Sequence, residues 1–118
     1  MGYESRLYVV DKKSLMGTET KRWAEVVAVF NMCKFGAFNG VFQKETDCFV
    51  YADDGNTKIT EDKYGDVLTE ASIKEVIKYL EGYKENQEHY RRVEPLLGLL
   101  KSFNPSEWEE LVVLHYGY

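Results

Sequence analysis

The sequence is poor in the residues that most often carry chemistry. Its 118 residues contain only two cysteines, two histidines and two prolines. The spacing of Cys33, Cys48, His89 and His115 matches no zinc knuckle or zinc ribbon. Asp53-Asp54-Gly55-Asn56 resembles the start of a calcium loop, but the glycine and glutamate that such a loop needs further along are missing. We therefore expect neither a metal nor another cofactor.

Long apolar runs are also missing. No stretch approaches the roughly 18 apolar residues that would indicate a membrane span. Met1 leads into Gly-Tyr-Glu-Ser-Arg, which lacks the apolar core of a signal peptide. Together these features predict a cytoplasmic protein with no membrane contact. Two cysteines suit a reducing compartment and we expect them as small core residues, although neighbouring strands would allow a disulfide.

An excess of positive charge is missing too, since the net charge is −5. Residues 1–60 hold equal numbers of acidic and basic side chains, so residues 61–118 carry the whole negative charge. Because phosphate backbones attract basic surfaces, we expect no direct nucleic-acid binding. A negative charge of this size is common in proteins and helps to keep them soluble. The alternative is an acidic surface that mimics nucleic acid.

Aromatic residues are plentiful, at 14% of the chain, and hydrophobic residues make up 44%. A chain of this length and composition predicts a single globular domain over residues 1–118. Aromatic side chains fill cores, and they are also enriched where proteins bind one another. The high aromatic content is therefore compatible with a surface that binds another protein.

Alternating and β-branched apolar residues predict strands near 3–11, 23–33, 48–52, 57–60 and 111–116. Residues 23–34 also carry an apolar stripe at helical spacing, but Val-Val-Ala-Val-Phe favours a strand that pairs with the first. We expect a polar loop at 12–22 and an aromatic loop or single helical turn at 35–46. The terminal strand is so apolar that we place it in the centre of the sheet.

Helical periodicity and end signals predict helices at 72–92, 95–102 and, in short form, 105–110. Ser72 and Glu75 form a capping box, and Gly82 offers an earlier end to the first helix. Strands followed by helices and one last strand predict an α+β fold, a small antiparallel or mixed sheet with helices on one face.

No motif identifies an enzyme. Glycine-rich phosphate loops and nucleophile elbows are missing. His115, in the terminal strand beside Tyr116, is either a structural sheet histidine or a general base facing a cleft. We assign no catalytic residue.

Loop aromatics supply the candidate partner surface. Four aromatic residues fall in predicted loops, where they are not needed to fill the core: Phe35, Phe38, Phe42 and Tyr64. We therefore expect a non-enzymatic protein that binds another protein, with self-association left open. The alternatives are an acidic nucleic-acid mimic and a small ligand-binding or enzymatic domain that uses His115 and Tyr116.

Three pieces of the chain resemble small proteins encoded by phages and prophages of Gram-positive bacteria. They are the opening Gly2-Tyr3-Glu4-Ser5-Arg6-Leu7-Tyr8-Val9-Val10, the middle piece Cys48 to Lys63, and the close Leu111-Val112-Val113-Leu114-His115-Tyr116-Gly117-Tyr118. No activity is attached to that group. The resemblance implies an accessory protein that works by binding in the cytoplasm of a bacterial host, and it assigns no residue a role.

Overall fold

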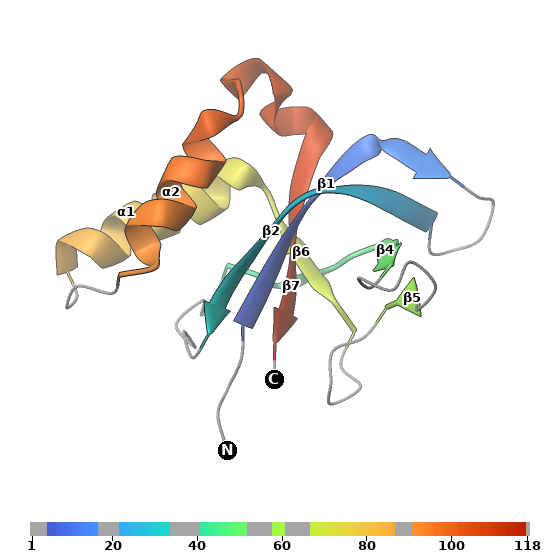
Figure 1. Cartoon of the computed structure of the whole chain (residues 1–118), viewed down its shortest axis with the longest axis horizontal. Coiled ribbons are helices and arrows are strands. Elements are labelled where there is room, and N and C mark those ends of the chain that lie inside the picture. The colour runs from blue at the N-terminus through green and yellow to red at the C-terminus, as the bar shows by residue number, and fades with distance from the viewer. Residues whose placement is uncertain are drawn as a thin grey trace.

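The computed structural model describes residues 5–16, 22–33, 41–51, 58–60, 67–86 and 91–117. These ranges form seven strands, two α-helices and one 3₁₀ helix (Figure 1). Their order is β1 (Ser5–Met16), β2 (Arg22–Cys33), β3 (Lys44–Glu45), β4 (Cys48–Tyr51), β5 (Lys58–Ile59), β6 (Thr69–Ala71), α1 (Ile73–Asn86), α2 (Val93–Ser102), η1 (Pro105–Glu110) and β7 (Leu111–Gly117).

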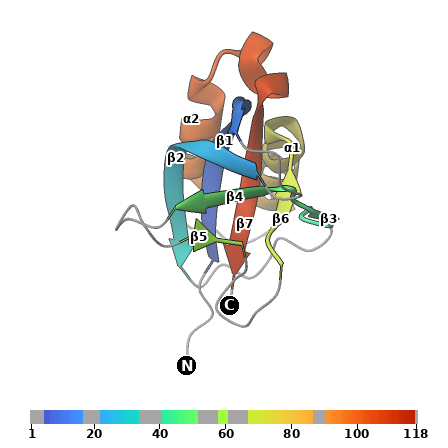
Figure 2. The same ribbon diagram turned by 90° about the vertical axis from the view of Figure 1, so that its right-hand side faces the viewer.

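The strands form one sheet in the order β3-β6-β7-β1-β2-β4-β5. The β2–β4 pair is parallel and the other pairs are antiparallel, so the sheet is mixed. Figure 2 shows that the sheet curls, with β4 and β5 folded across one end of it. Both helices lie on the outer face of this curl (Figure 1). The predicted α+β fold, with helices on one face of the sheet, is confirmed.

The central strands β1 and β7 supply apolar side chains to both faces of the sheet. In β1, Leu7 and Val9 belong to the cluster beneath the helices, whereas Tyr8 and Val10 belong to the cluster inside the curl. Successive residues of a strand point to opposite faces, which gives this alternation. Burial on both faces explains the nearly continuous apolar sequence of these strands.

The terminal strand β7 lies between β6 and β1, at the centre of the sheet as predicted. Leu111 to Leu114 are all buried, and they alternate between the two clusters. Strand pairing with β1 on one side and β6 on the other holds β7 in place.

Residues 22–33 form a strand, as the β-branched pattern favoured. They pair with β1 as the predicted hairpin, with register shifts that leave Val27 without a direct partner in β1. An extra residue of this kind is a β-bulge, which bends its strand. The bend lets the start of β2 pair with β4 while its second half stays beside β1 (Figure 2).

Several predicted boundaries are wrong. Residues 12–16 continue β1 instead of beginning a loop, because Met16 still pairs with Trp23 of β2. In the range 35–46, Lys44 and Glu45 form the short edge strand β3. Strand β6 was not predicted, because its three residues are too few to show a periodic pattern. Its pairing with β3 and β7 defines it as a strand.

The helices begin near their predicted starts. The capping box is confirmed, since the Ser72 hydroxyl accepts from the Glu75 backbone amide at 3.1 Å and donates to the Glu75 carboxylate at 3.0 Å. Helix α1 continues through Gly82 to Asn86, short of the predicted residue 92. Helix α2 begins at Val93, two residues before the predicted start, and Pro95 is tolerated in its first turn.

The last short helix is 3₁₀. Asn104 caps it as predicted, because the Asn104 side-chain oxygen accepts from the Ser106 amide at 3.1 Å. Helix η1 carries Trp108, whose indole Nε1 donates to the Phe103 carbonyl at 3.1 Å. This turn therefore holds the indole in one orientation beside the two longer helices.

Candidate functional site

The predicted site residues fall into two groups. Phe35, Phe38 and Tyr64 lie outside the described residues. Phe42, His115 and Tyr116 are described, and all three are half-buried. The predicted aromatic patch is thus represented only by Phe42.

Phe42 lies on His115. The two rings stack with centroids 4.9 Å apart and planes 16° from parallel. Phe42 also packs against the cluster beneath the helices, while Tyr116 packs against the cluster inside the curl. His115 and Tyr116 are adjacent in β7 and so point to opposite faces of the sheet. The pair does not line one shared cleft, and the His115–Phe42 stack suits a structural role for both rings.

Cys48 is fully buried in the cluster inside the curl and its thiol is free. Burial raises the pKa of this thiol above its ordinary value of 9.0, and the neighbouring Asp47 carboxylate raises it further, against a lowering hydrogen bond with Thr46. A reactive cysteine needs a lowered pKa and access to solvent. Cys48 therefore belongs to the core, as predicted for it.

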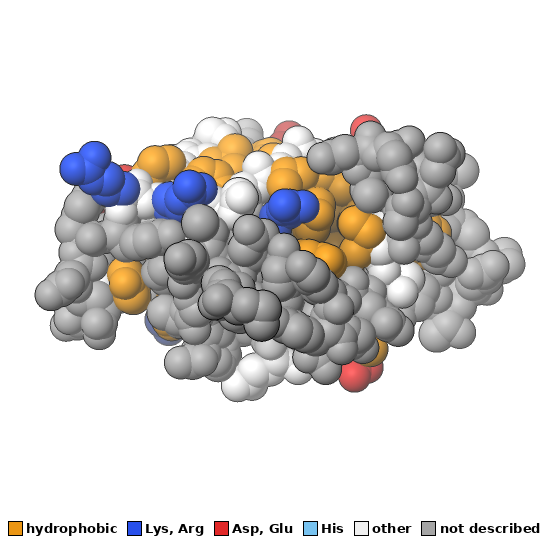
Figure 3. Space-filling model, turned by 60° about the horizontal axis from the view of Figure 1, so that its bottom comes forward, with side chains coloured by type: hydrophobic (Ala, Val, Ile, Leu, Met, Phe, Trp, Pro, Cys, Tyr) orange, Lys and Arg blue, Asp and Glu red, His pale blue; other side chains and the backbone are white. Residues whose placement is uncertain are grey.

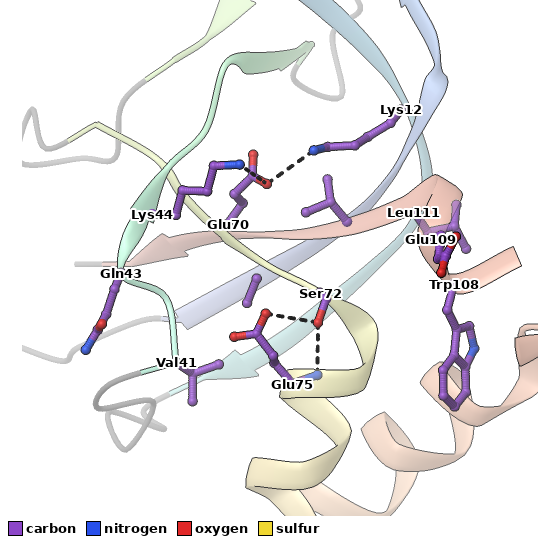
Figure 4. Close-up of a pocket in the computed structure, with 12 residues that line it drawn as sticks. Lys12, Val41, Gln43, Lys44, Glu70, Ser72, Glu75, Trp108, Glu109 and Leu111 are labelled. Carbon is purple, nitrogen blue, oxygen red and sulfur yellow. Dashed lines mark hydrogen bonds and ion pairs between the residues drawn. The ribbon is translucent and has the colours of Figure 1, made fainter.

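A polar pocket of about 330 Å³ lies at the β3–β6 edge of the sheet, beside the first turn of α1 (Figure 4). Its most buried polar side chain is Glu70 of β6, which is 6% exposed. Glu70 Oε2 lies 3.4 Å from Lys12 Nζ and 3.7 Å from Lys44 Nζ. Lys44 reaches this oxygen from the adjacent strand β3, and Lys12 reaches it from β1, on the far side of β7, so the carboxylate has a positive charge on two sides.

The other Glu70 oxygen, Oε1, is buried without a hydrogen-bond partner in the described part of the chain. Ser72 also lines this pocket, but its hydroxyl is engaged in the capping box. Glu70 was not predicted as a site residue, because its short strand β6 shows no pattern in the sequence.

A wider groove of about 760 Å³ lies between α1, α2 and η1. Its apolar strip consists of Ile77, Pro105 and Trp108. Three lysines line the groove together with this strip: Lys74 and Lys78 from α1, and Lys101 from α2. Trp108 is shared, because it lines both the groove and the polar pocket.

Lysine outnumbers glutamate in this groove. Lys101 Nζ lies 3.0 Å from Glu81 Oε2, and both side chains are exposed. Lys74 and Lys78 make no ion pair within the described ranges, and both are exposed. They are four residues apart on a helix and so lie on the same side of it. A locally positive groove thus exists in the half of the chain that carries the negative charge.

No protein-family model, curated protein or solved structure matches the chain. Within the described ranges, no group of three or more His, Cys, Asp and Glu side chains is arranged to hold a metal ion. None of the described helices is long and apolar enough to cross a bilayer.

The face drawn in Figure 3 shows how the described side chains are distributed. Hydrophobic side chains gather between separate Lys and Arg side chains, whereas Asp and Glu show only near its margins. This face carries no contiguous carboxylate stripe among the described residues. Among the residues that the structure describes, the acidic groups of the second half of the chain are therefore not concentrated on this face.

Proposed function

We propose that this protein is a non-enzymatic binding protein whose α1–α2–η1 groove holds an acidic segment of a protein partner. The observation that carries the proposal is that Lys74, Lys78 and Lys101 line the same groove as an apolar strip, with Glu81 as the one carboxylate in the lining. Complementary charge steers a partner to its site and suppresses wrong partners. The apolar strip then supplies the contact area that stabilises the complex.

The apolar strip is suited to anchoring a side chain. Trp108 is half-buried, and its Nε1 hydrogen bond to the Phe103 carbonyl fixes the ring before any partner arrives. A fixed ring loses little conformational entropy on binding. Tryptophan is also among the residues most enriched at binding hot spots. The expected partner segment places an apolar side chain against Trp108 and its carboxylates against the lysines.

Two alternatives receive less support. An acidic nucleic-acid mimic needs contiguous carboxylates over residues 61–110, and the lysines of the groove interrupt that range. A general-base role for His115 with Tyr116 needs both in one cleft, but they point to opposite faces of β7. A groove lined by lysines and apolar side chains supports the binding of an acidic protein segment better than it supports either alternative.

The resemblance to phage and prophage proteins supports the same kind of activity. It implies an accessory protein that works by binding, and we extend the proposal to the cytoplasm of a bacterial host. The partner would be a host or phage protein with an exposed acidic segment.

The test is a selection from a random peptide display library with the whole protein as bait. We expect enriched peptides to combine Asp or Glu with a large apolar residue. Lys78→Glu should weaken a selected peptide at least about tenfold in fluorescence anisotropy, because it places a carboxylate beside the ligand's own. Arg91→Glu is the matched control, since it makes the same change in charge at an exposed residue outside the groove lining.

Salt gives a second measurement. Affinity for the selected peptide should fall as salt rises, because exposed charges are screened. The proposal is wrong if the selected peptides are not acidic, or if Lys78→Glu and Arg91→Glu weaken binding equally. A library that yields no binder at micromolar concentration would contradict it as well.

A further inference from the structure

One wall of the α1–α2–η1 groove is a stripe of residues along α1. Five residues of this helix line the groove: Lys74, Ile77, Lys78, Glu81 and Gly82. Their spacing places them on one face of the helix, because residues three and four apart are neighbours on its surface. At the rise of an α-helix the stripe is about 12 Å long, so a partner can follow α1 for about two turns.

Both walls of the groove are helical. α1 forms one wall, and the facing wall comes from the end of α2 and from η1. Helices pair their backbone amides and carbonyls internally, so the described residues of the lining offer a partner no strand edge. An extended segment would leave the backbone groups that face the apolar strip without partners, which is costly where water is excluded. A helical segment satisfies its own backbone, and amphipathic helices commonly bind in grooves.

Gly82 leaves space in the wall formed by α1. A Cβ atom added to this glycine would meet no heavy atom within 4 Å among the described residues beyond its neighbours in the helix. Because glycine has no side chain to hold a second backbone away, another chain can approach closely here. Gly82 therefore marks the point at which a partner helix can come closest to α1.

Charge is uneven along the groove. Lys101 Nζ lies 3.0 Å from Glu81 Oε2, so these two charges offset each other beside Gly82. Lys74 and Lys78 lie nearer the start of α1 and make no ion pair within the described ranges. The positive end of the groove is therefore the end near the start of α1.

We propose that the acidic segment held by this groove is an amphipathic α-helix that packs along α1 and comes closest to it at Gly82. This helix is the ligand of the function proposed above, so the proposal rests on that function. Carboxylates one turn apart on the partner helix lie beside Lys74 and Lys78, which are themselves one turn apart. An apolar side chain on the same face of the partner lies against Trp108, and a small residue faces Gly82, which allows a short distance between the two helix axes.

The test uses the synthetic peptide most enriched in the random-library selection, titrated against the whole protein by fluorescence anisotropy. In an alanine scan of this peptide, the positions that weaken binding should recur about every three or four residues, as on one face of a helix, whereas a strand would give a spacing of about two. At a position where alanine leaves the affinity unchanged, glycine should weaken binding about fivefold and proline more than about a hundredfold, following helix propensity.

Circular dichroism measures the conformation of the bound peptide. The far-ultraviolet spectrum of the mixture should show more helix than the sum of the spectra of peptide and protein recorded separately. The same mixture made with the Lys78→Glu protein should show a smaller excess, because less complex forms when a carboxylate replaces a groove lysine.

Gly82→Leu tests the point of closest approach. The added side chain fills the space over α1 and should weaken the peptide at least about tenfold, because overpacked contacts are costly. Gly98→Leu is the matched control and should bind as the wild type does. Gly98 also lies in a helix, and a Cβ atom there also meets no heavy atom within 4 Å among the described residues, but it does not line the groove. Both variants should keep or raise the thermal midpoint of the wild type, since leucine favours a helix over glycine.

A failure of the helix can be told from a failure of the acidic groove. A peptide that Lys78→Glu weakens, but that tolerates proline and gains no helix on binding, would leave the acidic groove in place and overturn the helix. Equal effects of Gly82→Leu and Gly98→Leu would overturn it as well. A selection that yields no acidic peptide would contradict the function proposed for the groove, and the helix with it.

Discussion

Single residues show how burial controls chemistry in this protein. Glu70 is a buried carboxylate between two lysines, and one of its oxygens has no partner in the described part of the chain. Removing a charge from water is costly, and attraction between partners only partly offsets that cost. Lys12 and Lys44 therefore mainly offset the cost of burying the Glu70 charge at the β3–β6 edge. They add little net stability.

Cys48 gives a prediction at the residue scale. Because burial raises the pKa of its thiol, the native state keeps a proton that the unfolded state releases above the ordinary pKa of 9.0. The free energy of unfolding should therefore fall as pH rises through that value. In a Cys33→Ala background, the stability difference between the Cys48 protein and its Cys48→Ala variant should shrink between pH 8 and about 9.5.

Urea denaturation at each pH measures this difference. The pair of variants isolates Cys48, because Tyr79 also has a raised pKa, from burial and the neighbouring Tyr83, and is present in both. Tyr79 ionises at higher pH and contributes equally to the two proteins. A stability difference that stays constant with pH would contradict the raised pKa of Cys48.

At the scale of single elements, α1 owes its start to local chemistry. The Ser72 hydroxyl satisfies the Glu75 amide, one of the donors that every helix leaves unpaired in its first turn. Ser72→Ala should lower the free energy of unfolding by about 1 kcal/mol. Thermal or urea denaturation gives the value.

Ser102→Ala is the matched control for this helix cap. The Ser102 hydroxyl donates to the Leu99 carbonyl at 2.5 Å, inside the last turn of α2, so it satisfies no amide at a helix start. Ser102→Ala should lower the free energy of unfolding by less than Ser72→Ala does. Equal losses from both substitutions would mean that the capping box does not set the start of α1.

At the scale of the whole molecule, the two apolar clusters depend on the same strands. Alternate residues of β1 and β7 enter the cluster beneath the helices and the cluster inside the curl. Neither cluster can open without disturbing the strands that support the other. We therefore expect the chain to unfold as one cooperative unit, as most domains of this size do.

Leu100→Ala tests this coupling, because Leu100 is fully buried in α2. It should lower the free energy of unfolding by about 2–5 kcal/mol, the usual result of leaving a cavity in a core. Far-ultraviolet and near-ultraviolet circular dichroism should still report one shared urea midpoint. Val67→Ala, at an exposed site, should change stability by less than about 0.5 kcal/mol. Helices that unfold before the sheet in Leu100→Ala would show that the clusters are independent.

The sequence by itself determined the elements whose signals are local. The apolar run of β7, the β-branched run of β2 and the capping box of α1 are readable because burial, propensity and capping each act over a few neighbouring residues. The α+β class and the central place of β7 followed from these signals.

Only the tertiary structure decided the features that depend on residues far apart in the sequence. β3 and β6 are too short to show a pattern. β6 is a strand because it pairs with β7, and β3 is a strand because it pairs with β6. The same contacts bury Glu70 between Lys12 and Lys44, and the docking of α1, α2 and η1 brings Lys74, Lys78 and Lys101 around Trp108. Such sites form only when separate elements pack together, because no local pattern encodes which side chains will then meet.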